Sequence, residues 1–187
     1  MAYKSASLEK YLSDLAARSP APGGGSAAAV NAAMGAALIS MVVNFTIGKP
    51  KYKPFEKDLK DILVKSEKLR QEFLNLVDLD VAAYKSKNVR DAIDVPFMLA
   101  RLCFEGAKLA PPLIRQGNSN LISDVAVAII FLEAAFASAC FNVEINLKCL
   151  GDKKFSAQVR KELSLKGKTI KKIRLKTEER VGQIIRG

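Results

Sequence analysis

Apolar residues recur every three or four positions along most of this chain, which is the spacing of one face of an α-helix. Sustained alternation of apolar and polar residues, which indicates strands, does not occur, and there is no Asn-Gly hairpin turn. Gly, Pro and short polar runs separate the periodic segments. The pattern predicts six helices, over residues 5–18, 25–47, 55–87, 95–110, 121–150 and 153–183.

Helix-end signals give these predicted boundaries their detail. Asp94 is the expected N-cap of the fourth helix, which is expected to start near Val95 with Pro96 in its first turn. The two prolines at 111–112 are expected to kink or restart that helix, and Gly167 is a candidate break in the last one.

The segment 19–48 has no charged residue and is long enough to span a bilayer. Small residues dominate it, and polar side chains occur at intervals along it, namely Ser26, Asn31, Ser40, Asn44 and Thr46. An apolar helix rich in small residues is typical of the centre of a soluble bundle. We therefore expect an all-α, single-domain bundle of about six helices over 1–187, with a long apolar central helix and no membrane partner.

Composition restricts the chemistry that this chain performs. It has 187 residues and no His, so acid–base work falls to carboxylates, Lys, Tyr or Cys. The net charge is +11, concentrated after Asp152, which indicates an anionic partner such as nucleic acid, a membrane surface or an acidic small molecule. The three cysteines lie in apolar segments without metal-ligand spacing, which predicts buried free thiols. With no apolar signal core at the N-terminus, the expected location is the cytoplasm.

A block of three glycines, Gly23, Gly24 and Gly25, precedes the long apolar helix, and Ser26 is its candidate cap. Free backbone N–H groups at a helix start suit a carboxylate or phosphate ligand. The block matches neither the phosphate loop nor the dinucleotide fingerprint. Local features alone therefore favour a tight turn over a ligand loop.

Polar residues on apolar helices are the other candidates for chemistry. Asp80, in "LVDLDVAAY", shares a helical face with apolar neighbours, so that desolvation is expected to raise its pKa. A structural carboxylate in the core is an equal alternative. Asp124 suits the first turn of its helix, and Asn142 belongs to a polar stripe with Ser138 and Asn146. That stripe serves either a ligand or hydrogen bonds between helices.

Four segments together resemble the cyclodeaminase family. They are "SPAPGGGSAAAVNAAMGAALISMVVNFTIGKPKY", then "DLDVAAY", "GNSNLISD" and "NVEINL", in that order, within about Leu8 to Phe155. The family includes the carboxyl-terminal domain of formiminotransferase-cyclodeaminase and stand-alone bacterial methenyltetrahydrofolate cyclohydrolases. One departure is the segment between Tyr84 and Pro96, which is shorter than is usual in the family.

The resemblance implies an all-helical, cytoplasmic homodimer that acts on tetrahydrofolate derivatives, including polyglutamylated forms, without a metal or other cofactor. It implies that Asp80 is the proton donor and acceptor. It also implies a folate pocket near Gly23, Gly24, Gly25, Ser26, Asn118, Asp124 and Asn142.

The expected reaction is cyclisation of 5-formimino-tetrahydrofolate to 5,10-methenyl-tetrahydrofolate with loss of ammonia, a step of histidine degradation. The first alternative is hydrolysis of the methenyl bridge in the same pocket. The second is a non-catalytic basic helical protein that binds nucleic acid or anionic lipid, although the last helix lacks the interleaved aromatic residues of base-stacking proteins. The third is an inactive homologue, which the short segment after Tyr84 supports.

Overall fold

The computed structural model describes residues 2–187, and its described residues form helices without strands. The α-helices are α1 (Leu8–Ala16), α2 (Gly24–Asn44), α3 (Glu56–Ser86), α4 (Val89–Ala107), α5 (Ala110–Gln116), α6 (Ile122–Leu150) and α7 (Lys153–Arg186). Three short 3-10 helices accompany them: η1 (Tyr3–Ser5), η2 (Pro50–Phe55) and η3 (Ser119–Leu121). The predicted all-α fold class is therefore confirmed.

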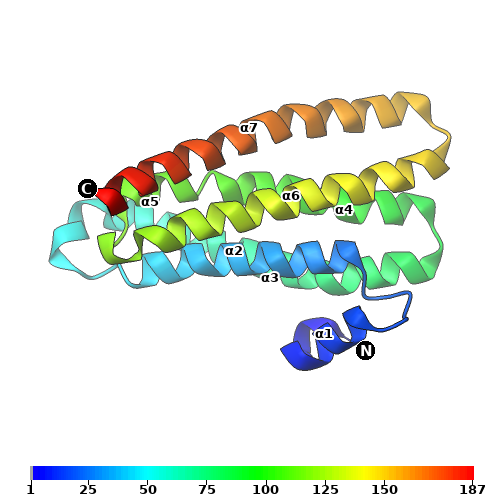
Figure 1. Cartoon of the computed structure of the whole chain (residues 1–187), viewed down its shortest axis with the longest axis horizontal. Helices are drawn as coiled ribbons and strands as arrows, with labels where there is room; N and C mark the ends of the chain where they lie inside the picture. Colours follow the sequence, from blue (N-terminus) through cyan, green and yellow to red (C-terminus); the bar gives the residue numbers. More distant parts are fainter. Residues whose placement is uncertain (1) are drawn as a thin grey trace.

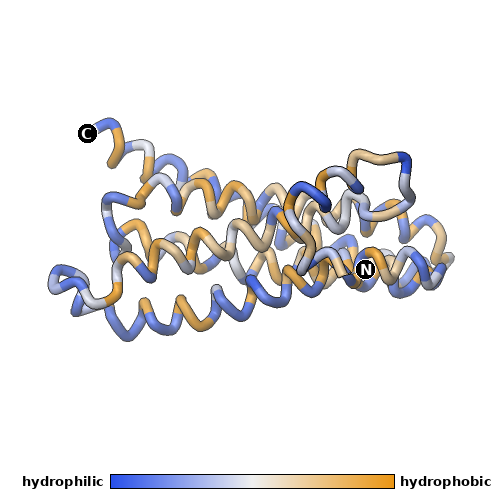
Figure 2. The backbone as a smooth tube through the Cα atoms, turned by 90° about the horizontal axis from the view of Figure 1, so that it is seen from below, coloured by the Kyte–Doolittle hydropathy of each residue, from blue (hydrophilic) through white to orange (hydrophobic). Residues whose placement is uncertain are grey.

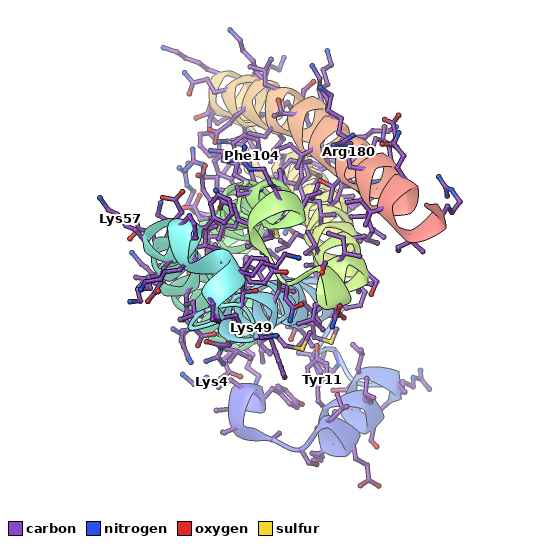
Figure 3. The ribbon with its side chains drawn as sticks, turned by 90° about the vertical axis from the view of Figure 1, so that its left-hand side faces the viewer. Lys4, Tyr11, Lys49, Lys57, Phe104 and Arg180 are labelled. Atoms are coloured by element: carbon purple, nitrogen blue, oxygen red, sulfur yellow. The ribbon has the colours of Figure 1, made fainter. Side chains whose placement is uncertain are left out.

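Four long helices form the core of the bundle (Figure 1). α2 packs against α3 and α6, α4 packs against α6 and α3, and α7 lies along the outside against α6 and α4. Successive long helices run antiparallel, so that the N-terminal end of α2 meets the C-terminal ends of α3 and α6 (Figure 1). α1 stands away from the bundle, next to α2 (Figures 1 and 3).

Small residues let α2 and α6 approach each other closely. A Cβ atom on Gly35 would lie 2.9 Å from Cγ of Leu132 and 3.0 Å from the backbone oxygen of Ala128. Asn31 joins the same two helices through a 3.0 Å hydrogen bond from its Nδ2 to the carbonyl oxygen of Phe131. The long apolar helix expected at 25–47 thus corresponds to α2, and α6 shares its central position in the core.

Several predicted helix boundaries need correction. α4 begins at Val89, and its cap is Asn88, whose side chain accepts a hydrogen bond from the Arg90 N–H at 2.9 Å. Asp94 is not the cap; its carboxylate pairs with Arg90 at 3.0 Å. Pro96 lies inside α4 rather than in its first turn, since Asn88 starts the helix earlier. In the short segment after Tyr84, only Lys87 and Asn88 lie outside the two helices, and Lys87 adopts a left-handed conformation.

In the second half of the chain, one predicted helix boundary is confirmed and another is wrong, and one of the three cysteines is more exposed than predicted. Pro111 and Pro112 occupy the first turn of α5, as the predicted restart requires. Gly167 does not break α7, which continues through it and packs there against the Phe136 ring. Cys103 is buried and Cys140 half-buried, but Cys149 is exposed, so the prediction of three buried thiols is wrong for Cys149.

Two helical segments are long and apolar enough to cross a membrane by length and composition, Gly24–Asn44 and Ser119–Leu150. In the first, 61% of the most apolar window is buried inside the bundle, but in the second only 39% is buried. Figure 2 shows hydrophobic and hydrophilic positions interspersed along the helices of the bundle. The second segment therefore presents apolar side chains that this chain does not itself cover.

The close packing at Gly35 makes a stability prediction. Gly35→Val should lower the free energy of unfolding by about 2 kcal/mol or more, because the added atoms meet Leu132 and rigid backbone. Gly182→Val is the matched control, since its Cβ meets only the mobile end of Arg186 and a side chain improves on glycine in a helix. Urea unfolding measures both, and equal stability for the two variants would contradict this packing.

Candidate active site

A pocket of about 180 Å³ lies where the N-terminal end of α2 meets the C-terminal ends of α3 and α6. Its walls are Pro20, Ala21, Gly23, Gly24, Gly25, Asp80, Ala83, Tyr84, Ala92, Asn142, Ile145 and Asn146. A larger groove of about 690 Å³ runs between α3, α4 and α5, but none of the predicted site residues lines it. The smaller pocket is therefore the candidate active site.

The carboxylate of Asp80 is held against the first turn of α2. Its Oδ2 accepts a 2.9 Å hydrogen bond from the backbone N–H of Ser26. The first backbone N–H groups of a helix have no partners inside the helix, so this bond satisfies one of them. Asp78 points to another face, where it accepts a 2.5 Å bond from the Tyr3 backbone N–H and serves to hold η1.

Gly25 makes room for this carboxylate. A Cβ atom at position 25 would overlap an oxygen of Asp80 and lie 2.7 Å from its Cγ. At Gly24 the nearest side-chain atoms are those of Asn142 at 3.9 Å, and at Gly23 nothing lies within 4 Å. The three glycines thus have different surroundings, and Gly25 is the one that the position of Asp80 requires.

The side chain of Ser26 fixes the same junction from the other side. Its hydroxyl is buried, donates to the carbonyl oxygen of Val77 at 3.1 Å and accepts from the Tyr11 hydroxyl at 3.1 Å. Ser26 is not the N-cap of α2, as the sequence suggested; that position belongs to Gly23. Tyr11 lies on the side of α1 that faces the bundle (Figure 3). α1, α2 and α3 are therefore joined one turn from Asp80.

Burial raises the pKa of Asp80 above its ordinary value, and the hydrogen bond from Ser26 opposes that rise without cancelling it. Desolvation disfavours the charged carboxylate, whereas an N–H donor favours it. Among the residues that line the pocket, Asp80 is the sole carboxylate. It is consequently the group in this pocket best suited to accept and return a proton.

Asn142 and Asn146 bring amide groups to the opposite wall. Asn142 donates from Nδ2 to the carbonyl oxygen of Ser138 at 2.9 Å, within α6. Asn146 donates to the carbonyl oxygen of Ala92 at 2.6 Å and so ties α6 to α4. Ser138 bonds back to Ala134 at 2.8 Å and does not line the pocket. Both amide oxygens, together with the first-turn N–H groups of Gly24 and Gly25, suit a ligand with several ring donors and acceptors.

Asn118 and Asp124 lie far from this pocket. Asn118 is buried beside the other end of α2, where its backbone N–H donates to Thr46 Oγ1 at 2.9 Å and its side chain caps η3. Asp124 lies in the first turn of α6. Since α2 has 21 residues, its two ends are about 30 Å apart. Within one chain, the structure therefore does not bring Asn118 and Asp124 together with Asp80.

The sequence did not identify Tyr11 or Tyr84 as residues of the site. Tyr84 is 59% exposed and lines the pocket. Its position near the C-terminal end of α3 was the available signal. Tyr11 gave no signal, because its link to Ser26 joins helices whose relative placement the sequence does not reveal.

No cluster of three or more potential metal ligands occurs between residues 2 and 187.

Comparison with known proteins gives consistent results. The sequence matches the profile of the formiminotransferase-cyclodeaminase family over residues 7–87 and 85–165. Methenyltetrahydrofolate cyclohydrolase of Methylorubrum extorquens is 41% identical in an alignment that covers 83% of this chain and 86% of that protein. Formimidoyltransferase-cyclodeaminase of Rattus norvegicus is 31% identical over 85% of this chain. The match covers 34% of the rat protein, so this chain corresponds to about a third of it.

The fold has a close counterpart among solved structures. The crystal structure of formiminotetrahydrofolate cyclodeaminase from Thermotoga maritima matches with a TM-score of 0.92 and 29% sequence identity. The match covers 97% of this chain and 98% of that one.

The contact between Gly25 and Asp80 predicts an energetic coupling. Gly25→Ala should lower the free energy of unfolding by about 1–3 kcal/mol, because the methyl group displaces the carboxylate. In an Asp80→Ala background most of that loss should disappear, which gives a coupling of about 1 kcal/mol or more. Gly24→Ala is the control and should show no such coupling. Additive effects of Gly25→Ala and Asp80→Ala in urea unfolding would mean that the two residues do not meet.

Proposed function

Because this chain belongs to the formiminotransferase-cyclodeaminase family, we propose that it is a folate enzyme that opens or closes the methenyl bridge of 5,10-methenyl-tetrahydrofolate. Hydrolysis of the bridge is the first candidate reaction, supported by 41% identity to a cyclohydrolase of which this chain covers 86%. Closure of the bridge from 5-formimino-tetrahydrofolate is the second, supported by the structural match to a cyclodeaminase. The family resemblance had led us to expect the second reaction first, although the sequence itself does not separate the two.

The observation that carries the proposal is the half-buried Asp80, the sole carboxylate of the pocket, with its pKa raised by burial. In hydrolysis, Asp80 accepts a proton from water as the water oxygen attacks the methenyl carbon. The protonated Asp80 then gives that proton to the departing ring nitrogen as the carbon–nitrogen bond breaks. The hydroxyl proton is released to solvent as the formyl carbonyl forms.

The same residue serves the second candidate reaction. One folate nitrogen attacks the carbon of the protonated formimino group and loses a proton to Asp80. The resulting acid then protonates the amine that leaves as ammonia, and the positive charge stays on the methenyl bridge. Both reactions need one group that takes and returns a proton, and a carboxylate with a raised pKa meets that need. Neither step needs a metal or redox cofactor, so we propose that the folate is the sole ligand.

The remaining walls suit a pterin ring. The free N–H groups of Gly24 and Gly25 are expected to bind a ring oxygen or nitrogen, as helix starts bind electronegative atoms. The amide oxygen of Asn142 is expected to accept from a ring N–H. The net charge of +11 attracts the glutamate carboxylates of folate tails, polyglutamylated ones included. Part of the basic surface is internally paired, as Arg160 with Glu144 at 2.9 Å shows.

An absorbance assay of the methenyl chromophore tests the function. Purified protein receives 5,10-methenyl-tetrahydrofolate in one cuvette and 5-formimino-tetrahydrofolate in the other. Faster decay in the first cuvette identifies the cyclohydrolase, and a rising signal with ammonia release in the second identifies the cyclodeaminase. No change in either cuvette would contradict the proposal and leave a binding protein or an inactive homologue.

Asp80→Asn tests the assigned residue. The variant should lose roughly 100-fold or more in kcat, because the amide cannot exchange the proton. It should be at least as stable as the parent at pH 7, since the raised pKa means that ionised Asp80 costs stability as pH rises through that pKa. Wild-type kcat should rise with pH through the same raised pKa, and that limb should vanish in the variant. Retained kcat with an unchanged pH profile would remove Asp80 from the mechanism.

A further inference from the structure

Tyr84 is an aromatic residue that the fold leaves largely uncovered at the candidate active site. It lines the pocket and is 59% exposed, although Val81 and Ala83 just before it in α3 are buried. Burial of apolar area is what stabilises a fold, so an exposed ring contributes little to the free energy of unfolding. The carbonyl oxygen of Tyr84 accepts from the Lys87 N–H at the end of α3, but any residue type supplies that bond. The side chain is therefore available to a ligand.

Tyr84 lies one helical turn beyond the carboxylate of the pocket. It follows Asp80 by four residues within α3, and both line the pocket. Side chains four residues apart share a face of a helix, with their Cβ atoms about 5–6 Å apart. Asp80 is held against the first turn of α2 by the Ser26 N–H, and Tyr84 is nearer to the end of α3. A ligand whose reacting atoms meet Asp80 therefore has its next group beside Tyr84.

Ile145 adds a second exposed apolar side chain to the same pocket. It is 58% exposed and belongs to α6, whose Asn142 and Asn146 form the wall opposite Asp80. The pocket thus has two chemically different parts. Its polar part consists of Asp80, the first-turn N–H groups of α2 and the two amides, and its apolar part includes Tyr84 and Ile145.

The volume of the pocket limits how much of a folate it encloses. It holds about 180 Å³, whereas sites that enclose a ligand of moderate size hold roughly 300–1,000 Å³. A tetrahydrofolate carries a reduced pterin ring and an aminobenzoyl ring, and the methenyl carbon bridges one nitrogen of each. The pocket therefore encloses one of these two rings and leaves the other at its mouth.

The chemistry of the two rings decides which of them is enclosed. The pterin ring carries several N–H groups and a carbonyl, which are costly to bury without hydrogen-bond partners. It therefore belongs with the polar part of the pocket. The aminobenzoyl ring has no donor or acceptor among its ring atoms, and aromatic rings attract one another in stacked or edge-to-face arrangements. With the methenyl bridge at Asp80, the aminobenzoyl ring reaches Tyr84, one helical turn away.

We propose that Tyr84 binds the aminobenzoyl ring of the folate by stacking, and that this contact makes the protein select folates over free pterins. The assignment rests on the proposed function, because it names the part of that substrate which Tyr84 contacts. Stacking on Tyr84 also holds the aminobenzoyl nitrogen, one of the two nitrogens that carry the bridge, beside Asp80. Ile145 completes the apolar mouth from the wall of α6.

Calorimetric titration with two ligands tests the contact without turnover. Tetrahydrofolate carries both rings, whereas 6-methyl-tetrahydropterin carries the pterin ring alone. Tyr84→Ala should weaken the binding of tetrahydrofolate about tenfold, which is the scale of one ring stacked on an aromatic side chain. It should leave the binding of 6-methyl-tetrahydropterin unchanged. Tyr84→Phe should bind both ligands like the wild type, because the ring rather than the hydroxyl makes the contact.

Two control variants accompany this titration. Val64→Ala removes an apolar side chain that is 70% exposed elsewhere on α3, so neither affinity should change. Asn142→Ala should weaken both ligands alike, because it acts on the ring that they share. Tyr84 has no charge, so the glutamate tail of tetrahydrofolate contributes equally to the affinities of the wild type and of Tyr84→Ala.

Proton NMR of bound tetrahydrofolate reports the stacking itself. A stacked aromatic ring shifts the aminobenzoyl protons upfield through its ring current. That shift should occur with the wild type and with Tyr84→Phe, and it should be lost with Tyr84→Ala. A purely structural role for Tyr84 would not produce this pattern.

The two ligands also separate failure of this assignment from failure of the proposed function. Equal weakening of both ligands by Tyr84→Ala, or no weakening of either, would overturn the role of Tyr84 and leave the proposed function standing. A wild-type protein that binds neither ligand and turns over neither folate substrate would overturn the proposed function together with the contact.

Discussion

The contact between the Asp80 carboxylate on α3 and the first turn of α2 is the interaction on which the rest of the candidate site depends. Asp80 accepts a hydrogen bond from the Ser26 backbone N–H, and the space for its side chain exists because residue 25 has no Cβ atom. The Ser26 hydroxyl holds the same junction through Val77 and Tyr11. An acidic side chain at a helix start would ordinarily be favoured as an anion. Here burial outweighs that effect, and the raised pKa leaves the group ready for proton transfer.

Small residues allow helices to pack closely both in the core and at the candidate active site. Gly35 and its alanine neighbours let α2 approach α6 closely enough to bury Leu132, and Gly25 lets the start of α2 approach α3. Both α2 and α6 also carry large apolar side chains that are exposed on their outward sides. A helix built of small and apolar residues without charge is stable in water when it is covered on all sides. The stripe of exposed apolar side chains on α6 is the part of this surface that the chain leaves uncovered.

The sequence predicted the helices well because their apolar periodicity is long and regular. It failed at ends where two signals competed. α4 starts at Val89, six residues before the predicted Val95, and the helix accommodates Pro96 in its interior. Asp80 was found from its apolar face, and Asn142 from its stripe. Tyr11 and the special role of Gly25 were missed, because both depend on contacts between helices that periodicity does not specify. The distance between Asp124 and Asp80 was missed for the same reason.

The most direct test of this account is the pKa of Asp80 itself, measured by carbon NMR of its carboxyl group through a pH titration, with Asp80→Asn used to assign the signal. A desolvated carboxylate that serves as proton acceptor and donor must titrate above 3.8, the ordinary value for Asp. A midpoint clearly above that value is the predicted result. A midpoint at or below it would show that the helix start and the Ser26 N–H dominate over burial. Asp80 would then be a structural anion that ties α3 to α2.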